Sequence, residues 1–210
     1  MRMRKKKYGK ERLEACGEYV LGEAAADLHE VFGNENPVYL EIGCGKGDFI
    51  CGTAAANPGI NFIAIERIPD VLMLAAEKVK ANGYNNVRLA AFNAALLPER
   101  IPAHSVSRIY LNFSDPWPKK GHAKRRLTYR AFLDIYKQIL TPHGEIFLKT
   151  DDLSLFEFSI SELRDAGFDV RDVTYDLHAS PYAEGNVMTE YERNFVSQGK
   201  KINRLTAYLL

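Results

Sequence analysis

Apolar positions along this chain follow two periods, one typical of strands and one typical of helices. Runs of strand length lie at residues 38–42, 61–66, 86–92, 106–113 and 145–150, and further strands are expected at 168–177 and 202–210. Between them, apolar residues recur at helical spacing over 48–56, 69–82, 126–140 and 153–166, and another helix is expected to start at 189. Strands that alternate with helices predict an α/β fold with a mainly parallel, seven-stranded sheet and helices on both faces.

The first part of the chain is expected to differ from this alternation. Residues 1–12 predict a flexible basic arm, because seven cations lie there against one acid. A helix is expected from about Glu14 to Phe32, ending near Gly33. No linker or repeat interrupts residues 13–210, so they are expected to form a single domain. Within it, a turn is expected at 141–144, which contains a proline and a glycine.

Composition narrows the setting in which the chain works. No apolar run approaches the roughly 20 residues that a membrane span needs, and the basic N-terminus has no apolar run behind it. The three cysteines, Cys16, Cys44 and Cys51, show no paired Cys-x-x-Cys spacing. These features predict a cytoplasmic protein without a disulfide framework or a metal site.

Charge is unevenly distributed, although the net charge is only +1. A second basic cluster follows the first and contains Lys119, Lys120, Lys124, Arg125, Arg126 and Arg130. No acid lies between Asp115 and Asp134. Either cluster alone is equally typical of a solvated surface, but two of them in a near-neutral chain favour a polyanionic partner.

A glycine-rich turn follows the first apolar run. Glu41 is followed by Gly43, Gly45 and Gly47, which let the backbone turn sharply and approach a ligand closely. The dinucleotide fingerprint requires a third glycine at position 48, which is Asp48, so a nicotinamide dehydrogenase is disfavoured. An acid, a strand and G-x-G-x-G are instead typical of S-adenosylmethionine methyltransferases, although a plain strand–helix turn has a similar pattern.

Polar residues at the ends of the next two strands strengthen this interpretation. Glu66 lies about 20 residues beyond the loop, where such folds place a carboxylate against the ribose hydroxyls. Asn93 follows the third strand and is expected either to bind the adenine edge or to serve as a turn residue.

The segment after the fourth strand is the candidate active site. Asp115-Pro116-Trp117 resembles the Asn/Asp-Pro-Pro-aromatic loop of amino-group methyltransferases that act on DNA and RNA. Here proline and tryptophan alternate, and Lys119 and Lys120 follow. Trp117 is expected either to stack on a base or to pack in the core.

Several segments, taken in order, closely resemble the bacterial tRNA (guanine-N7-)-methyltransferase family. They are Met-Arg-Met-Arg-Lys-Lys-Lys at 1–7, Glu-Ile-Gly-Cys-Gly-Lys-Gly at 41–47, Ser-Asp-Pro-Trp-Pro-Lys-Lys at 114–120, Lys-Arg-Arg-Leu-Thr-Tyr at 124–129, Lys-Thr-Asp at 149–151 and Thr-Glu-Tyr-Glu at 189–192. The resemblance implies a Rossmann-like class I S-adenosylmethionine-dependent methyltransferase. Its members make 7-methylguanosine in the variable loop of tRNA, as monomers or homodimers.

The resemblance also implies roles for single residues. Glu41, Glu66, Asn93 and Asp115 would line the S-adenosylmethionine site, and Asp115 would also be the catalytic residue. The implied substrate-binding residues are Lys119, Lys124, Arg125, Arg126, Asp151, Thr189, Glu190, Tyr191 and Glu192. Many relatives have Asp at the position of Asn93; because Asn can still accept from and donate to adenine, at most an altered cofactor affinity is expected. Gly121-His122-Ala123 is less charged than an RNA-binding loop of this family should be.

The chemistry of guanine N7 limits what the catalytic carboxylate must do. N7 carries a free lone pair, so no proton has to leave before methyl transfer. Asp115 is therefore expected to orient the purine and to stabilise its developing positive charge. Two other functions remain open: methylation of an adenine amino group, and RNA binding without turnover on a methyltransferase fold.

Overall fold

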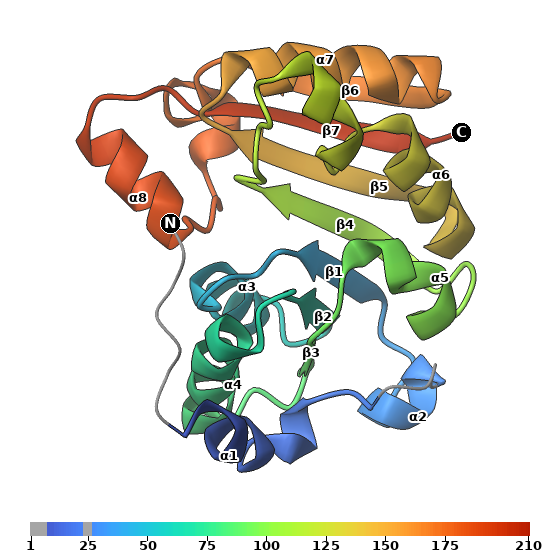
Figure 1. The fold of residues 1–210 in the computed structure, drawn as a ribbon, viewed down its shortest axis with the longest axis vertical. Helices are drawn as coiled ribbons and strands as arrows, with labels where there is room; N and C mark the ends of the chain where they lie inside the picture. The colour runs from blue at the N-terminus through green and yellow to red at the C-terminus, as the bar shows by residue number, and fades with distance from the viewer. Residues whose placement is uncertain (1–7, 23–26) are drawn as a thin grey trace.

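A seven-stranded sheet forms the centre of the fold (Figure 1). The structure, a computed structural model, describes residues 8–22 and 27–210. The strands run in the order β3-β2-β1-β4-β5-β7-β6, and all neighbours are parallel except β7, which is antiparallel to both β5 and β6. Their bounds are β1 Val38–Ile42, β2 Asn61–Ile65, β3 Val87–Ala90, β4 Val106–Asn112, β5 Leu140–Thr150, β6 Phe168–Thr174 and β7 Asn203–Leu209. The predicted mainly parallel, seven-stranded sheet is therefore confirmed.

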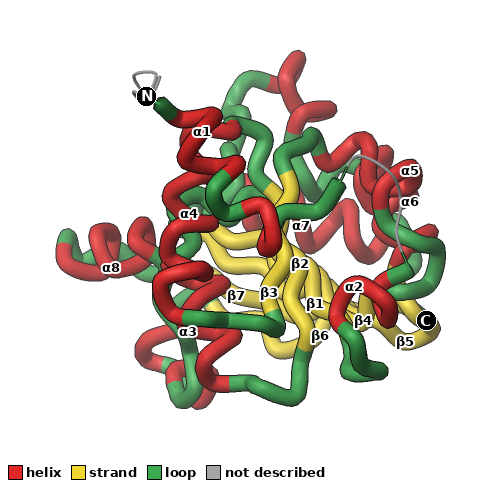
Figure 2. The backbone as a smooth tube through the Cα atoms, turned by 90° about the horizontal axis from the view of Figure 1, so that it is seen from below, coloured by secondary structure: helices red, strands yellow, loops and turns green. Residues whose placement is uncertain are grey.

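Helices cover both faces of this sheet, because successive side chains of a strand point to opposite sides. In β2, Phe62 and Ala64 pack in one cluster with α3 (Asp48–Ala56) and α4 (Pro69–Asn82). Ile63 and Ile65 pack in a second cluster with α5 (Leu97–Arg100), α6 (Arg130–Ile139) and α7 (Leu153–Asp165). Figure 2 shows α3 and α4 on one side of the sheet and α5 and α6 on the other.

Two connections differ from the sequence prediction. The helix expected to begin at 126 is α6, which begins at Arg130. The 3-10 helix η3 (Lys120–Arg125) precedes it, and residues 126–129 form bends and turns. Strand β5 begins at Leu140, through the residues expected to form a turn. His143 takes the left-handed backbone conformation there, with φ of 62°, so the chain bends without leaving the strand.

The N-terminal part also differs. The single helix expected from Glu14 to Phe32 is wrong: α1 (Gly9–Glu14), the 3-10 helix η1 (Gly17–Tyr19) and α2 (Leu28–Phe32) are separate. Val20 interrupts them by pairing with Leu89 of β3. The expected arm boundary at residue 12 lies inside α1, where Arg12 donates to Glu77 of α4 at 2.7 Å. Residues 1–7 of that arm lie outside the described residues.

The ends of the parallel strands determine where a site can form. The C-terminal ends of β1, β2, β4 and β5 lie at the same edge of the sheet, and helix α8 (Glu190–Ser197) projects from the molecule on that side (Figure 1). Ligands of parallel α/β sheets bind beyond this edge. Within residues 8–22 and 27–210, no helix is long and apolar enough to cross a membrane.

Gly47 joins the glycine-rich turn to helix α3 and explains why that turn packs so closely. Its φ is 82°, and a Cβ built on it would lie 2.7 Å from the Cβ and 2.9 Å from the Cα of Ala75 on α4. Gly17 is a useful comparison, because a Cβ there meets nothing within 4 Å.

We expect Gly47→Ala to destabilise the protein by about 3 kcal/mol, through the clash with α4 and the left-handed backbone. For a chain of this size, the midpoint of thermal unfolding should fall by roughly 6–12 °C. Calorimetry of Gly47→Ala beside Gly17→Ala measures this difference. Equal midpoints for the two variants would contradict the close approach of α3 and α4.

Candidate active site

The glycine-rich turn and Glu66 form one hydrogen-bonded unit. Gly43, Gly45 and Gly47 all have positive φ, which confirms that the turn needs residues without a Cβ. The backbone nitrogens of Gly43 and Cys44 donate to the carbonyl of Ile65, at 2.8 and 3.1 Å. One carboxylate oxygen of Glu66 accepts from the nitrogen of Gly45 at 3.3 Å, and the other accepts from Ile68 at 3.0 Å. The sheet therefore brings the loop and Glu66 together.

Glu41 lies beneath this turn and is only 2% exposed. Its Oε1 accepts from Nδ2 of Asn112 at 3.1 Å, but its Oε2 and the Oδ1 of Asn112 are buried and have no hydrogen-bond partner in residues 8–22 and 27–210. Burial raises the pKa of Glu41 to about 7, although the Asn112 hydrogen bond and the charge of Lys149 act in the opposite direction. Two orphaned acceptors side by side favour a ligand that donates hydrogen bonds or carries positive charge.

Asn93 is an exposed residue after β3, and its turn interpretation is confirmed. It caps the 3-10 helix Ala94–Leu96, where its Oδ1 accepts from the nitrogen of Ala95 at 3.0 Å. Among the described residues, its Nδ2 has no partner. The capping role leaves an amide donor available at this edge of the sheet.

Asp115 follows β4, is exposed and receives no hydrogen bond from the part of the chain that the structure describes. The loop that carries it holds unusual backbone angles, with φ of 52° at Phe113 and 43° at Trp117. Arg126 fixes this loop from below: its Nε donates to the carbonyl of Pro116 at 3.0 Å and its Nη2 to that of Trp117 at 3.1 Å. Arg126 is 7% exposed. The RNA contact expected of Arg126 is therefore replaced by a clamp on the loop.

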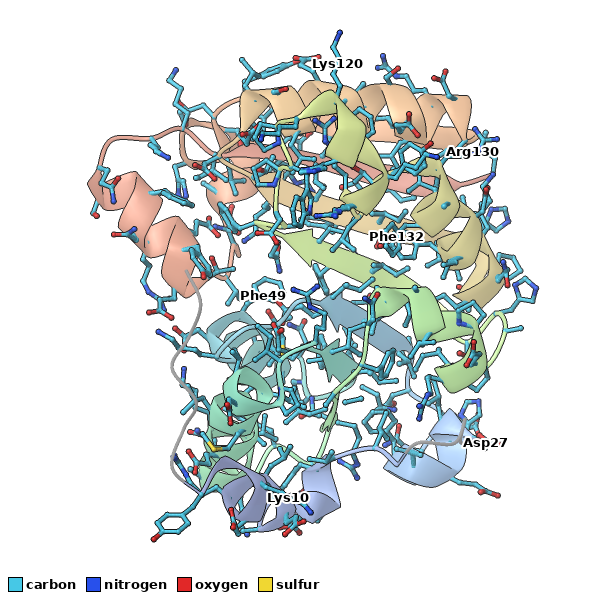
Figure 3. The ribbon with its side chains drawn as sticks, viewed as in Figure 1. Lys10, Asp27, Phe49, Lys120, Arg130 and Phe132 are labelled. Carbon is cyan, nitrogen blue, oxygen red and sulfur yellow. The ribbon has the colours of Figure 1, made fainter. Side chains whose placement is uncertain are left out.

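Trp117 is half-buried and belongs to the loop surface instead of the core. The guanidinium of Arg125 lies 4.8 Å from the centre of its indole ring, and His122 approaches the ring edge-on at 5.7 Å. Lys119, Lys124 and Arg125 are exposed and form no ion pair within the described residues. Figure 3 shows Lys120 at the outer surface, pointing away from the molecule. These cations remain available to a polyanion.

The residues expected to hold the substrate base divide into outward and inward groups. Glu190 pairs with Lys46 of the glycine-rich turn at 2.7 Å, and Asp151 pairs with Lys200 at 2.7 Å. Tyr191 is 63% exposed. Thr189 instead caps α8, where its hydroxyl accepts from the nitrogen of Glu192 at 2.9 Å. Direct contact was expected of all of these residues, and the structure brings them to one edge of the sheet.

Glu192 departs from the expected arrangement, because it points inward and is fully buried. Its carboxylate pairs with the ammonium of Lys149 at 2.7 Å and also accepts from Asn186 at 2.7 Å. In this structure neither oxygen is free to accept from a base. No role was expected of Lys149 or Asn112. Each follows three apolar residues near the C-terminal end of its strand, 146–148 in β5 and 109–111 in β4, and a polar residue at that place was the available signal.

A cavity of about 530 Å³ lies beside this site, between α3, the sheet and residues 177–187. Phe49, Thr53, Lys149 and Arg204 line it, whereas Glu66, Asn93 and Asp115 do not. We take the strand ends as the candidate site, because the free carboxylate and the glycine-rich turn lie there, and the cavity only adjoins it.

Comparison with known proteins identifies the class. Solved structures with the same fold include an antibiotic-related methyltransferase, with a TM-score of 0.70 at 20% identity over 92% of this chain and 98% of that chain. Another is the 16S rRNA methyltransferase KamB, with a TM-score of 0.65 at 15% identity over 91% and 98% of the two chains. The fold is that of a Rossmann-like class I methyltransferase.

Sequence comparison narrows this class to a family. A family described as "Putative methyltransferase" matches residues 35–205. A tRNA (guanine-N(7)-)-methyltransferase of Streptococcus thermophilus (strain CNRZ 1066) is 49% identical over 99% of this chain and 98% of that protein. One of Brevibacillus brevis is also 49% identical, over 85% of this chain and 83% of that protein. The chain belongs to the family of bacterial tRNA (guanine-N7-)-methyltransferases.

The raised pKa of Glu41 predicts a pH-dependent cost to folding. Its ordinary value is 4.5 and its folded value is about 7, so the folded state holds the proton more tightly. The free energy lost by burying the ionised Glu41 carboxylate is therefore absent below pH 4.5, grows as pH rises towards 7, and is complete above pH 7. Glu41→Gln should be more stable than the parent by roughly 3 kcal/mol at pH 8, and this gain should vanish near pH 4.5.

Urea unfolding of both proteins at pH 5 and pH 8, without added ligand, measures this difference. The comparison isolates Glu41, because every other titrating group is shared between the two proteins. A gain of the same size at both pH values would mean that the substitution acts through packing and not through charge.

Proposed function

We propose that this protein transfers the methyl group of S-adenosylmethionine to N7 of a guanine in the variable loop of tRNA. The observation that carries the proposal is the unpaired carboxylate of Asp115, which lies at the same edge of the sheet as the glycine-rich turn and Glu66. The family relationship supports the same reaction.

The residues at this edge fit S-adenosylmethionine. The orphaned oxygen of Glu41 and its neighbour Asn112 would accept from the ammonium group of the methionine part. Glu66 would accept from the ribose hydroxyls, and the free Nδ2 of Asn93 would donate to adenine. The cofactor supplies a methyl group on a sulfonium. The glycines, which have positive φ and no Cβ, would allow the backbone to approach it.

Asp115 acts on the purine. The N7 lone pair attacks without prior loss of a proton, and positive charge develops on the ring as the methyl group arrives. A carboxylate near that ring is therefore worth more in the transition state than in the ground state. Because Asp115 has no internal partner among the described residues, its charge is not neutralised within the free protein.

Selection of guanine over adenine follows from the acids beside Asp115. Guanine presents N1–H and N2–H₂ as donors, a pair that adenine lacks, and carboxylates only accept. Asp151 and Glu190 carry such groups, held in the free protein by Lys200 and Lys46. These ion pairs are partly exposed, so their exchange for a guanine edge costs little. This chemistry favours guanine over the adenine amino group.

The exposed cations after Asp115 bind the phosphates of tRNA. Lys119, Lys124 and Arg125 lie on or next to η3, without acidic partners in the described part of the chain. Their contacts with phosphates would release counterions and make binding strongly salt-dependent. That attraction would offset the energy needed to expose a guanine from the folded tRNA core.

We expect Asp115→Ala to lower the rate of methyl transfer by at least about 100-fold, because it removes the charge that stabilises the purine cation. Affinity for tRNA should change little. Asp115→Asn is the matched control, since it keeps the shape but not the charge, and it should be almost as impaired. The measurement is transfer of labelled methyl to unmodified tRNA, with the product nucleoside identified after digestion.

Near-normal transfer by Asp115→Ala would refute the role of this carboxylate. Recovery of a methylated adenine would instead support the amino-group alternative. Binding of tRNA by the parent protein without any transfer of methyl would indicate an RNA-binding module.

Neighbouring arginines allow a second test. Arg125→Ala removes an exposed cation, so binding of tRNA should weaken and the slope of log affinity against log salt should fall by about one. Arg126→Ala removes the clamp on the carbonyls of Pro116 and Trp117, so it should lower the rate of transfer while leaving that slope unchanged. Binding titrations at several salt concentrations, with single-turnover rates, separate the two effects. An altered slope for Arg126→Ala alone would contradict this division.

A further inference from the structure

Lys149 is a buried lysine whose ammonium group is fully satisfied. It lies near the end of β5 and is 1% exposed. Its Nζ donates to Oδ1 of Asn186 at 3.0 Å, to the carbonyl of Val187 at 3.0 Å and to Oε2 of Glu192 at 2.7 Å. An ammonium has three donors, so all of them are used. The chain between Asn186 and Glu192 is thereby wrapped around one side chain of the sheet.

Glu192 is the counterpart of Lys149 and is equally enclosed. Beyond its bond to Lys149, its Oε1 accepts from Nδ2 of Asn186 at 2.7 Å and lies 3.1 Å from Nε2 of His178. Its backbone nitrogen is bound by the cap at Thr189. Moving Glu192 outward would leave the charge of Lys149 buried without its acid, which is strongly unfavourable.

The other ionic attachments of α8 are more exposed. Lys46 and Glu190 form a pair whose side chains are 44% and 51% exposed, and Arg193 pairs with Asp48 with exposures of 52% and 25%. Surface pairs of this kind contribute little to holding a helix. The ring of Phe195 also lies 5.9 Å from that of Phe113. The buried pair is therefore the strongest polar anchor among the described contacts of α8.

The same lysine adjoins the cofactor side of the site. Lys149 is paired in register with Asn112 across β4 and β5, and Asn112 donates to Glu41. A continuous polar row thus runs from Glu41 beneath the glycine-rich turn, through Asn112 and Lys149, to Glu192 on α8. One end of this row faces the cofactor residues and the other holds the substrate helix.

We propose that Lys149 and Glu192 are positioning residues: their buried pair fixes α8 on β5, so that Glu190 and Tyr191, and not Glu192, face the guanine. The proposal rests on the proposed function for the identity of the base. It assigns Glu192 an indirect role, because its carboxylate acts through the placement of its neighbours.

Amide hydrogen exchange on the RNA-free protein tests the placement of α8. Lys149→Met removes the ammonium and keeps most of the side-chain length, and Glu192→Gln removes the charge of the partner. Both variants should exchange faster over residues 186–197, by at least about tenfold, while β1 to β4 stay protected. Lys137→Met is the matched control, since this half-buried lysine of α6 donates to the carbonyl of Ala166, far from α8. This control should leave the rate of amide exchange over residues 186–197 unchanged.

Single-turnover methylation then tests the role in the reaction. Lys149→Met should lower the single-turnover rate constant for methyl transfer to tRNA by about 100-fold, the cost of a misplaced substrate group. Its affinity for S-adenosylmethionine should change less than threefold. The double variant Lys149→Met with Glu192→Gln should be no worse than the worse single variant, because both disrupt one anchor.

Three results would overturn the proposal: unchanged exchange over 186–197 in both variants, additive losses in the double variant, or a Glu192→Gln protein with normal exchange but impaired turnover. The last would mean that Glu192 touches the base itself. If Lys149→Met does not fold, Asn186→Ala removes one contact to each partner and should raise the same exchange; no change would equally refute the anchor. Because exchange is measured without RNA, its outcome is independent of which nucleoside is methylated.

Discussion

Burial of charge at one edge of the sheet is the constraint on which the site depends. Glu41, Lys149 and Glu192 are almost completely enclosed, and an unpaired charge in such a place is very unfavourable. Lys149 and Glu192 satisfy each other, with help from Asn186. Burial still lowers the pKa of Lys149, while the charge of Glu192 opposes that shift. Within the part of the chain that the structure describes, the Glu41 carboxylate has one hydrogen-bond partner, Asn112, so it remains the group that a cationic ligand can best stabilise.

The two walls of the site are held by different means. On the side of Asp115, a buried arginine donates to two carbonyls and fixes an irregular loop with left-handed residues. On the side of α8, a buried lysine donates to two acceptors in the segment that leads into the helix and to Glu192 of the helix itself. In both cases the cation donates to backbone carbonyls of a segment that lies outside the helices and strands. This leaves Asp115 and Glu190 exposed, yet their positions are determined by buried neighbours.

The sequence predicted the sheet well because period and strand length depend on local pattern. It also placed the glycine-rich turn, Glu66 and Asp115 at the ends of strands, and the structure brings all three to one edge of the sheet. It did not predict which charged residues point into the protein, because the same residue type can lie on the surface or form buried contacts. Arg126 belongs to a basic run and was expected on RNA, but its neighbours in space are carbonyls. Glu192 belongs to a polar motif, but it lies three residues after Thr189, whose hydroxyl caps its backbone nitrogen. At that position in the first turn of α8 its side chain points inward. Such inward orientation depends on tertiary contacts, which periodicity does not encode.

Fold and site carry different information about substrate. The structures that share this fold at 15% and 20% identity show only a class I methyltransferase. Substrate choice has to come from groups that the fold does not determine. In the proposed function these are the acids and the exposed cations beyond the strand ends: the carboxylates would accept from the donors of guanine, and the lysines and arginines would bind a polyanion. Because Asp151 and Glu190 pair with lysines before RNA arrives, the free protein keeps its acids compensated until a better donor replaces those lysines.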